Sequence, residues 1–398
     1  MKNKQFKFRI ISIFLGISLV INGIFVSSIA FDFDLPFFQK TIVDENEYNE
    51  YKKFKKIVNL KSEIDEKYYK EVSEDKLIEG AVNGMFYALN DKYSYYIPKE
   101  ELKKKQNSEK GISIGIGISI NILEDGKIKV VSVDQEGTAM EAGLKVNDII
   151  TDINGIELNL DTIHDALGEV SKDNKKYIIF GDYPNINITV IRDNKELKLE
   201  VQRKKMIEKA LSYEIMDNNI GYIKIEHFIQ DTPKYFKEAL SYMNDNKIDK
   251  IIIDLRNNPG GLLSSVVKTT GYLVGKEEIL YTENKNEEKK IYSADSDKIY
   301  DGKVCVIVND KSASASEAMT AALKDYDRAV ILGTNTFGKG IVQTTYPLTD
   351  GTGYKLTTNE YFSPKGNKIH KIGIKPDIEI TDSKIQLEKA LDLLSKEK

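Results

Sequence analysis

The stretch IIIDLRNNPGGLL, residues 251–263, determines the fold that we expect for this chain. It opens with branched apolar residues, a run that is typical of a strand buried on both faces. The run ends at Asp254, and Pro259, Gly260 and Gly261 form a turn before an apolar pattern of helical period. A buried strand that leads through such a turn into a helix is the repeating unit of α/β proteins.

The same alternation continues on both sides of this stretch. We expect strands at 220–228, 303–310 and 329–334, and helices at 232–244, 261–274 and 316–326. The sequence therefore predicts an α/β core at 205–381, with a largely parallel sheet and helices on its faces. A terminal amphipathic helix is expected at 382–398.

In the chain before this core, the spacing of apolar residues changes from a helical period to the alternation of strands. Apolar residues between 77 and 89 lie on one helix face that closes before Pro98, so we expect a linker and a helical segment at 32–110. Further on, the sequence alternates and is rich in glycine, and an Asp193–Asn194 turn joins two strand patterns. These features predict a separate β-rich domain at 111–204.

The first residues have the composition of a membrane-targeting segment. A basic flank precedes residues 10–31, which carry no charge and are long enough to span a bilayer. Because basic flanks stay in the cytoplasm, we expect residues 1–31 to form a single-pass anchor in the cell membrane, with the rest of the chain outside. The sequence SIA at 28–30 resembles a signal-peptidase site, so cleavage and secretion are the alternative.

The overall composition argues against several classes of function. The net charge of −4 offers no basic surface for nucleic acid. The single cysteine, Cys305, lies in the apolar run VCVIV, so we expect a core residue and no intramolecular disulfide. No HExxH, CxxC or EF-hand pattern occurs, so we expect no built-in metal site.

The stretch NDKSASASEAMTAAL, residues 309–323, presents Ser314 and Glu317 at the spacing of a capping box. As the N-cap, Ser314 would satisfy an amide of the first helical turn. The same position, where a buried strand meets a helix N-terminus, also suits a nucleophile, because nearby amides can hold an oxyanion. Both interpretations of Ser314 are open at this point.

Lys339 is the candidate base for such a nucleophile. Gly338 and Gly340 flank it and would let the backbone approach another segment closely. A lysine accepts a proton only when its amine is neutral, which burial favours by lowering its pKa. The side-chain amide of Gln343 could orient that amine without adding a charge. The alternative is a solvated lysine in a glycine turn.

Taken in order, DLRNNPGG, SASASE, FGKGIVQ and SPKGNKIHKIGIKPDIEI resemble the motifs of the carboxy-terminal processing proteases, also called tail-specific serine proteases. The stretch at 74–101 is similar to the helical segment of this family, and GIGISI with AGLKVNDIITDINGI looks like its PDZ domain. The resemblance runs from about residue 44 to residue 381. It implies a crotonase/ClpP-like α/β protease core with an inserted PDZ domain.

The resemblance also implies a role for each candidate residue. Ser314 is then the nucleophile, Lys339 is its general base and Gln343 is the supporting amide. The backbone N–H groups of Ala315 and Gly260 are then the oxyanion hole, whereas local sequence alone also fits an ordinary strand-to-helix loop at Gly260. The implied reaction needs no cofactor.

A PDZ domain binds a C-terminal carboxylate in a loop of backbone amides and adds the peptide as a strand. The resemblance places this carboxylate loop at Gly115, Ile116, Gly117 and Ile118. The expected partners are proteins or peptides with flexible C-terminal tails. The chain departs from the family at 171–185, which is longer and more apolar than the usual glycine-rich link.

We therefore expect an extracytoplasmic serine endopeptidase that binds substrate tails through its PDZ domain and cleaves them through an acyl-enzyme. One alternative is a membrane-tethered PDZ scaffold with an inactive protease fold, and another is an acyl-CoA hydratase on a crotonase-like core. His227 is expected near the cleft in a strand, and the tyrosines at 93, 95 and 96 are expected to pack at a helix end. The helical terminal segments leave a homodimer open.

Overall fold

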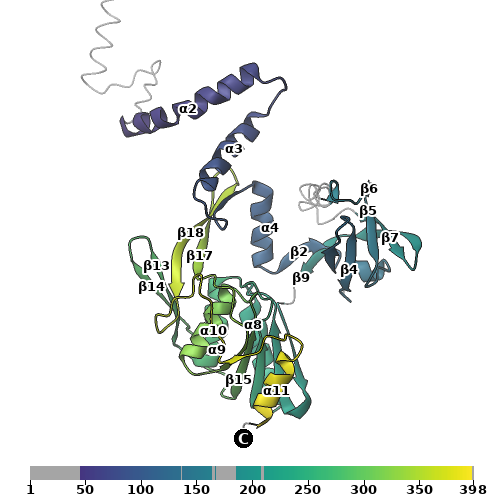
Figure 1. Ribbon diagram of the computed structural model, residues 1–398, viewed down its shortest axis with the longest axis vertical. Coiled ribbons are helices and arrows are strands. Elements are labelled where there is room, and N and C mark those ends of the chain that lie inside the picture. The colour runs from purple at the N-terminus through teal and green to yellow at the C-terminus, as the bar shows by residue number, and fades with distance from the viewer. Residues whose placement is uncertain (1–44, 136, 164–165, 167–184, 208–209, 397–398) are drawn as a thin grey trace, which may run out of the picture. The chain divides into compact units, whose positions relative to one another are not determined.

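The computed structural model describes residues 45–135, 137–163, 166, 185–207 and 210–396 (Figure 1). The chain divides into two units, residues 1–84 and residues 85–398. No helix in these described ranges is long and apolar enough to cross a membrane, and the predicted span at 10–31 lies outside them.

The first unit is helical where it is described. It contains α2 (Glu45–Lys67) and most of α3 (Glu74–Tyr87). The ammonium group of Lys61 links the two helices, because it lies 3.1 Å from a carboxylate oxygen of Asp65 on α2 and 3.1 Å from one of Glu74 on α3. Large apolar side chains of α2 are exposed, namely Tyr48, Tyr51, Phe54, Ile57, Val58 and Leu60.

The second unit begins with a short strand that the sequence did not predict. The strand β1 (Tyr95–Ile97) precedes α4 (Lys99–Glu109), and Pro98 is the N-cap residue of that helix. Tyr95 and Tyr96 therefore lie in a strand and not at a helix end. The helical pattern that we expected to continue through this region is interrupted here.

The β-rich domain is built on one antiparallel sheet and one strand pair. The sheet order is β3-β4-β5-β7-β8, with β6 on β5, and the separate pair joins β2 to β9. The elements are β2 (Ile112–Gly115), β3 (Ile118–Ile122), β4 (Ile128–Val133), α5 (Thr138–Glu141), β5 (Ile149–Ile153), β6 (Ile156–Glu157), β7 (Asn185–Arg192), β8 (Lys195–Gln202) and β9 (Lys204–Ile207).

The predicted Asp193–Asn194 turn is confirmed. Both residues have positive φ, 50° and 59°, as a two-residue hairpin loop of type I′ requires, and they join β7 to β8. Apolar residues from alternate positions of these strands form the domain's own core, including Val190 and Val201. The stretch at 171–185, where the chain departs from the family, lies almost entirely outside the described residues.

The α/β core is a six-stranded sheet in the order β10-β11-β12-β15-β16-β19. The pairs from β11 to β19 are parallel, and β10 is an antiparallel edge, so the predicted, largely parallel sheet is confirmed. The elements are β10 (Leu211–Met216), η1 (Asp217–Asn219), β11 (Ile220–Ile225), α8 (Thr232–Asp245), β12 (Lys250–Asp254), α9 (Leu263–Val274), β15 (Lys303–Val308), α10 (Ala315–Asp325), β16 (Val330–Gly333), β19 (Ile378–Glu379) and α11 (Gln386–Lys396).

Helices cover both faces of this sheet (Figure 1). Successive side chains of a strand point to opposite faces. In β12, Ile251 and Ile253 pack in the cluster that contains α8, α9 and α10, whereas Ile252 packs with Leu394 of α11. Cys305 of β15 is fully buried in this second cluster, which confirms the predicted core position.

A second, antiparallel sheet was not predicted from the sequence. Its order is β1-β18-β13-β14, and β17 pairs with β18. The strands are β13 (Glu278–Asn284), β14 (Lys289–Ser293), β17 (Ile341–Pro347) and β18 (Gly353–Phe362). This sheet positions the candidate site, because β17 contains Gln343 and begins two residues after Lys339.

Candidate active site

Ser314 lies in a strained backbone conformation at the N-terminus of α10. Its φ and ψ are 56° and −112°, a region that residues other than glycine rarely adopt. Such strain is of order 1–3 kcal/mol and is concentrated at functional sites. Ser314 is the N-cap of α10, as predicted, and its N–H donates to Glu317 Oε2 at 2.8 Å, as in a capping box.

The turn formed by Pro259, Gly260 and Gly261 packs directly on Ser314. A Cβ atom added at Gly260 would lie 2.9 Å from Ser314 Cβ and 2.8 Å from the Ala315 nitrogen. Gly260 also has a φ of +103°, so both space and backbone conformation require glycine at this position. The strand-to-helix turn is therefore in contact with the candidate nucleophile, 54 positions later in the sequence.

The buried carboxylate of Glu317 joins the segments of Ser314 and Lys339. Its Oε2 accepts hydrogen bonds from the N–H groups of Ser314 and Lys339, both at 2.8 Å. Its Oε1 accepts from the Gly338 N–H and the Thr336 hydroxyl, both at 2.6 Å. The sequence predicted Glu317 only as a helix cap, yet this one side chain fixes both candidate catalytic segments.

Lys339 lies in the loop between β16 and β17 and is half-buried. Its pKa is below the ordinary value of 10.5, chiefly because burial penalises the ammonium form. The nearby positive charge of Lys105 lowers this pKa further, whereas the charge of Glu317 opposes the shift. The predicted burial of this amine is thus present, and the flanking Gly340 allows a close approach, since a Cβ there would lie 2.3 Å from the His370 nitrogen.

Tyr93 contacts Lys339, which sequence reasoning missed. The Lys339 Nζ lies 4.7 Å from the centroid of the Tyr93 ring, within the range of a cation–π interaction. Lys92 Nζ lies 5.0 Å from the same centroid. Among the described residues no hydrogen bond joins Lys339 Nζ to Ser314 Oγ or to Gln343. Lys339 therefore rests against an aromatic ring in this structure.

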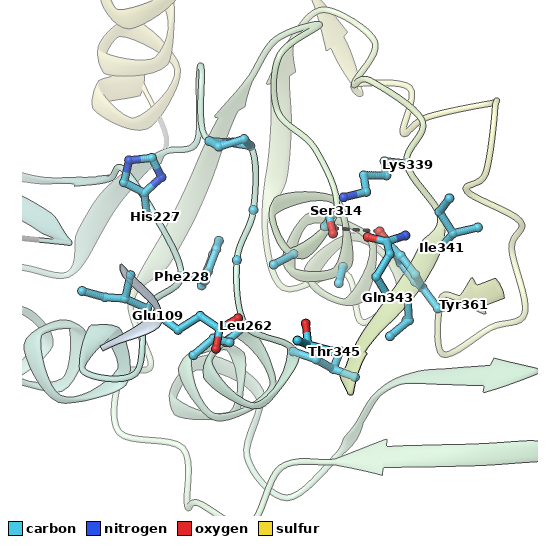
Figure 2. A pocket seen from close by; sticks show the side chains of 18 of the residues that line it. Glu109, His227, Phe228, Leu262, Ser314, Lys339, Ile341, Gln343, Thr345 and Tyr361 are labelled. Atoms are coloured by element: carbon cyan, nitrogen blue, oxygen red, sulfur yellow. Dashed lines mark hydrogen bonds between the residues drawn. The ribbon is translucent and has the colours of Figure 1, made fainter. Parts of the chain in front are cut away.

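Gln343 lies on β17 in the second sheet. Its Nε2 is 3.4 Å from Thr357 Oγ1, the residue opposite it on β18. Figure 2 shows Ser314, Lys339 and Gln343 grouped on one side of a cavity. The roles that the resemblance implied for these three residues stay predictions, but the fold brings their side chains to one place.

The oxyanion hole also stays a prediction. The Gly260 N–H donates to Asn258 Oδ1 at 2.8 Å, so it would have to share or exchange this partner to bind an oxyanion. Ala315 is the first residue of α10, where backbone N–H groups lack partners within the helix. The two amides are contributed by segments in direct contact.

The cavity beside these residues has a volume of about 390 Å³. Its apolar lining residues include Phe228, Leu262, Leu280, Ala318 and Val342. His227 and Glu109 lie across the cavity from Ser314 (Figure 2). His227 lines the cavity as expected, but the expectation that it lies in a strand is wrong, because β11 ends at Ile225. An extended peptide segment with an apolar side chain fits a space of this chemistry.

The Tyr361 hydroxyl, which also lines the cavity, holds the backbone of the candidate nucleophile Ser314. It donates to the Ser314 carbonyl oxygen at 2.8 Å, the bond drawn in Figure 2. Complete burial raises the pKa of Tyr361 well above its ordinary value. This hydroxyl therefore stays protonated and keeps its role as a donor.

The predicted carboxylate loop lies in the β-rich domain, and none of its residues lines the cavity described above. It connects β2 to β3, with Gly117 at a φ of +80°. The Ile116 carbonyl accepts from the Ala139 N–H at 2.9 Å, which ties the loop to α5. A Cβ at Gly117 would lie 2.8 Å from Gly137 Cα, so the loop packs tightly against the next turn.

Comparison with known proteins identifies the family. Residues 219–380 match Peptidase family S41, residues 37–101 match the N-terminal domain of the activating protease CtpB, and residues 129–176 match a PDZ domain. A "probable CtpA-like serine protease" of Staphylococcus aureus (strain bovine RF122 / ET3-1) is 35% identical over 334 residues, which are 83% of this chain and 65% of that protein.

A protein of Staphylococcus epidermidis (strain ATCC 12228 / FDA PCI 1200) with the same description is 34% identical, over 83% of this chain and 66% of its own length. This chain thus spans less than two thirds of these relatives. A solved photosystem II D1 C-terminal processing protease shares the fold, with a TM-score of 0.51 and 24% identity over 84% of this chain and 90% of that one. The chain belongs to the carboxy-terminal processing proteases of Peptidase family S41 and contains a PDZ domain.

Proposed function

We propose that this protein is a serine endopeptidase that cleaves peptide bonds through a Ser314–Lys339 dyad. The observation that carries the proposal is the Glu317 carboxylate, which binds the backbone N–H of both residues beside a peptide-sized cavity. The strained conformation of Ser314 and the lowered pKa of Lys339 support the same assignment. Both are properties expected of an activated nucleophile and its base.

In the proposed reaction, Lys339 as a neutral amine leaves the Tyr93 ring and takes the proton of Ser314 Oγ. The oxygen attacks the peptide carbonyl, and the N–H groups of Ala315 and Gly260 stabilise the oxyanion. The resulting ammonium then protonates the leaving amine, which gives an acyl-enzyme on Ser314. Lys339 next deprotonates a water molecule, whose attack releases the acyl group and restores the serine.

Gln343 would hold the amine of Lys339 toward Ser314 during these steps. Among the described residues, its side chain forms only one hydrogen bond, a long one of 3.4 Å to Thr357, so little is lost when it turns toward the lysine. The PDZ domain would hold the substrate's C-terminal carboxylate on the loop from Gly115 to Ile118 and so present the preceding segment for cleavage.

We further propose that residues 1–31 anchor the protein in the cell membrane, with the protease outside the cytoplasm. The uncharged run and its basic flank support this location. The exposed apolar side chains of α2 favour a homodimer, because burying them on a second copy would remove apolar area from water. Analytical ultracentrifugation of the purified chain tests the dimer, and a monomer at micromolar concentration would contradict it.

The test of the proposed activity uses the full-length chain in a mild detergent with casein as an unstructured substrate. Ser314→Ala and Lys339→Met should each lose activity by a factor of about 10² or more, since nucleophile and base are both required. Ser293→Ala and Lys290→Gln, two exposed positions on β14, are the matched controls and should retain the parental rate. Equal cleavage by all variants would refute the dyad.

The inactive-scaffold alternative gives a different result. A scaffold would bind peptides that end in a free carboxylate but would release no product with any variant. The acyl-CoA hydratase alternative would require binding of coenzyme A, which isothermal titration calorimetry measures directly.

A further inference from the structure

Lys339 and Lys355 both line the proposed catalytic cavity, and neither ammonium group forms an ion pair with a carboxylate of the described residues. Lys355, on β18, lines the cavity and is half-buried. In the described part of the chain, no carboxylate lies within ion-pair distance of its ammonium group. The centroid of the Tyr95 ring lies 6.0 Å from its Nζ, at the outer limit for a cation–π interaction. Partial burial of an ammonium group without a counter-charge costs desolvation free energy. An anion bound in the cavity beside it would offset this cost.

The sheet places Lys355 on the same face as the candidate catalytic residues. Lys355 lies opposite Thr345 on β17, and the neighbouring pair on this face is Gln343 with Thr357. Both Thr345 and Gln343 line the cavity. Two residues along a strand span about 7 Å, which is the spacing of alternate side chains in an extended peptide. A substrate side chain that contacts Lys355 is therefore about two residues along the peptide from one that contacts Gln343.

The surrounding charges do not neutralise this lysine. Lys105 and Glu109 on α4 both line the cavity, but they pair with each other at 2.8 Å. Lys339, the remaining lysine of the lining, is itself positive when protonated. Burial, with repulsion from Lys105 and Lys339, lowers the pKa of Lys355 to about 8, although the charge of Glu109 opposes this shift. At neutral pH it therefore remains mostly charged, and a bound anion would relieve the repulsion.

We propose that Lys355 forms a subsite for a carboxylate of the substrate, within about three residues of the scissile bond. The inference rests on the proposed protease activity and specifies its substrate class. The carboxylate can come from an Asp or Glu side chain or from the C-terminus of a short substrate. A peptide in the cavity with an acidic group at this position would complete an ion pair that the protein itself leaves open.

A different role for Lys355 would be purely electrostatic. Its charge could help to keep Lys339 neutral, as Lys105 does. That role would affect every substrate equally, because the base is common to all of them. Carboxylate recognition instead affects acidic substrates alone, so the ratio of rates for matched acidic and neutral peptides separates the two roles.

The experiment starts from the full-length chain and a casein digest in which cleaved sites are identified by mass spectrometry. The best site is then synthesised as peptides with blocked termini, bearing Glu or Gln at each of three positions on either side of the bond. The parent should cleave the best Glu peptide about tenfold faster than its Gln counterpart, measured as kcat/KM. Lys355→Gln should reduce this ratio to within twofold of one, and Lys290→Gln should leave it unchanged.

A further pair of peptides, one with a free C-terminal carboxylate and one with a C-terminal amide, tests whether the substrate's C-terminus supplies the anion. A preference for the free carboxylate that disappears in Lys355→Gln assigns the C-terminus to this subsite. The proposal is overturned if the parent shows no preference in either pair, or if Lys355→Gln slows acidic and neutral peptides alike. Cleavage of the neutral peptides by the parent tests the protease activity separately.

If the enzyme is latent and cleaves nothing, binding still tests the subsite. Fluorescence anisotropy with the Ser314→Ala variant should show about tenfold tighter binding of the blocked Glu peptide than of the Gln peptide. The difference should vanish when Lys355→Gln is added. Equal binding of both peptides by Ser314→Ala would overturn the proposal without reference to turnover.

Discussion

The substitution Glu317→Gln tests how the structure couples the proposed nucleophile, Ser314, to the proposed base, Lys339. The carboxylate accepts four hydrogen bonds, from the N–H groups of Ser314, Gly338 and Lys339 and from the Thr336 hydroxyl. Each carboxylate oxygen accepts two of these bonds. Glutamine keeps one accepting oxygen, but its NH₂ group replaces the other and cannot accept the two bonds there. Two bonds to a charged group are lost, at about 1.5–3 kcal/mol each, so the free energy of unfolding should fall by about 3–6 kcal/mol.

The same change should also slow catalysis, because it releases the segments of Ser314 and Lys339 from each other. A misplacement of about 1 Å reduces rates by about 10²-fold, so kcat should fall by at least that factor. Urea unfolding followed by circular dichroism measures the stability, and cleavage of a peptide from the casein digest measures kcat, both with the full-length chain.

Asp254→Asn is the matched control for this experiment. Asp254 is also buried and accepts bonds from Tyr222 and Arg256, but it does not line the cavity. Its substitution should lower stability by about 3–5 kcal/mol and leave kcat of the folded protein within about twofold. If Glu317→Gln affects stability as Asp254→Asn does but keeps the parental kcat, Glu317 is only structural and the reasoning is wrong.

Three further predictions concern the surroundings of the dyad. Lys105→Gln removes a charge that lowers the pKa of Lys339, so this pKa rises and the acid limb of the kcat/KM profile moves to higher pH; a shift to lower pH would contradict the assignment. Tyr93→Leu removes the ring that stabilises the ammonium form, so the acid limb should move about half to one unit lower, whereas Tyr93→Phe should not move it. Gly260→Ala should reduce kcat by about 10²-fold or more, because its Cβ would displace Ser314 and Ala315. Gly143→Ala is the control for backbone strain alone, since Gly143 has a φ of +85° and open space around it. Of the two glycine substitutions, only Gly143→Ala should retain the parental activity.

The α/β core could be predicted because its signals are local. The strand at 251–254 is uniformly apolar, and the turn residues after it leave little choice of conformation. The capping position of Ser314 was predicted for the same reason, because the cap and its partner are three residues apart. The positions of Ser314, Lys339 and Gln343 at one cavity were expected only from the resemblance to a family.

The second sheet was missed because its strands β17 and β18 show no regular alternation of apolar and polar residues. Residues such as Thr344, Thr357 and Thr358 in β17 and β18 give no apolar alternation to detect. The contact of Tyr93 with Lys339 and the bonds from Glu317 to the loop before β17 join residues far apart in the sequence. Local patterns cannot predict such contacts, since they arise only after the two sheets pack together.

Trapping of the acyl-enzyme tests the central claim most directly. The full-length chain would be mixed with a peptide ester, whose rapid acylation favours accumulation of the intermediate, then quenched with acid and analysed by intact mass spectrometry. The account predicts an adduct with the mass of the acyl group that maps to Ser314 and is absent from Ser314→Ala. An adduct on another residue, or one that persists in Ser314→Ala, would contradict it.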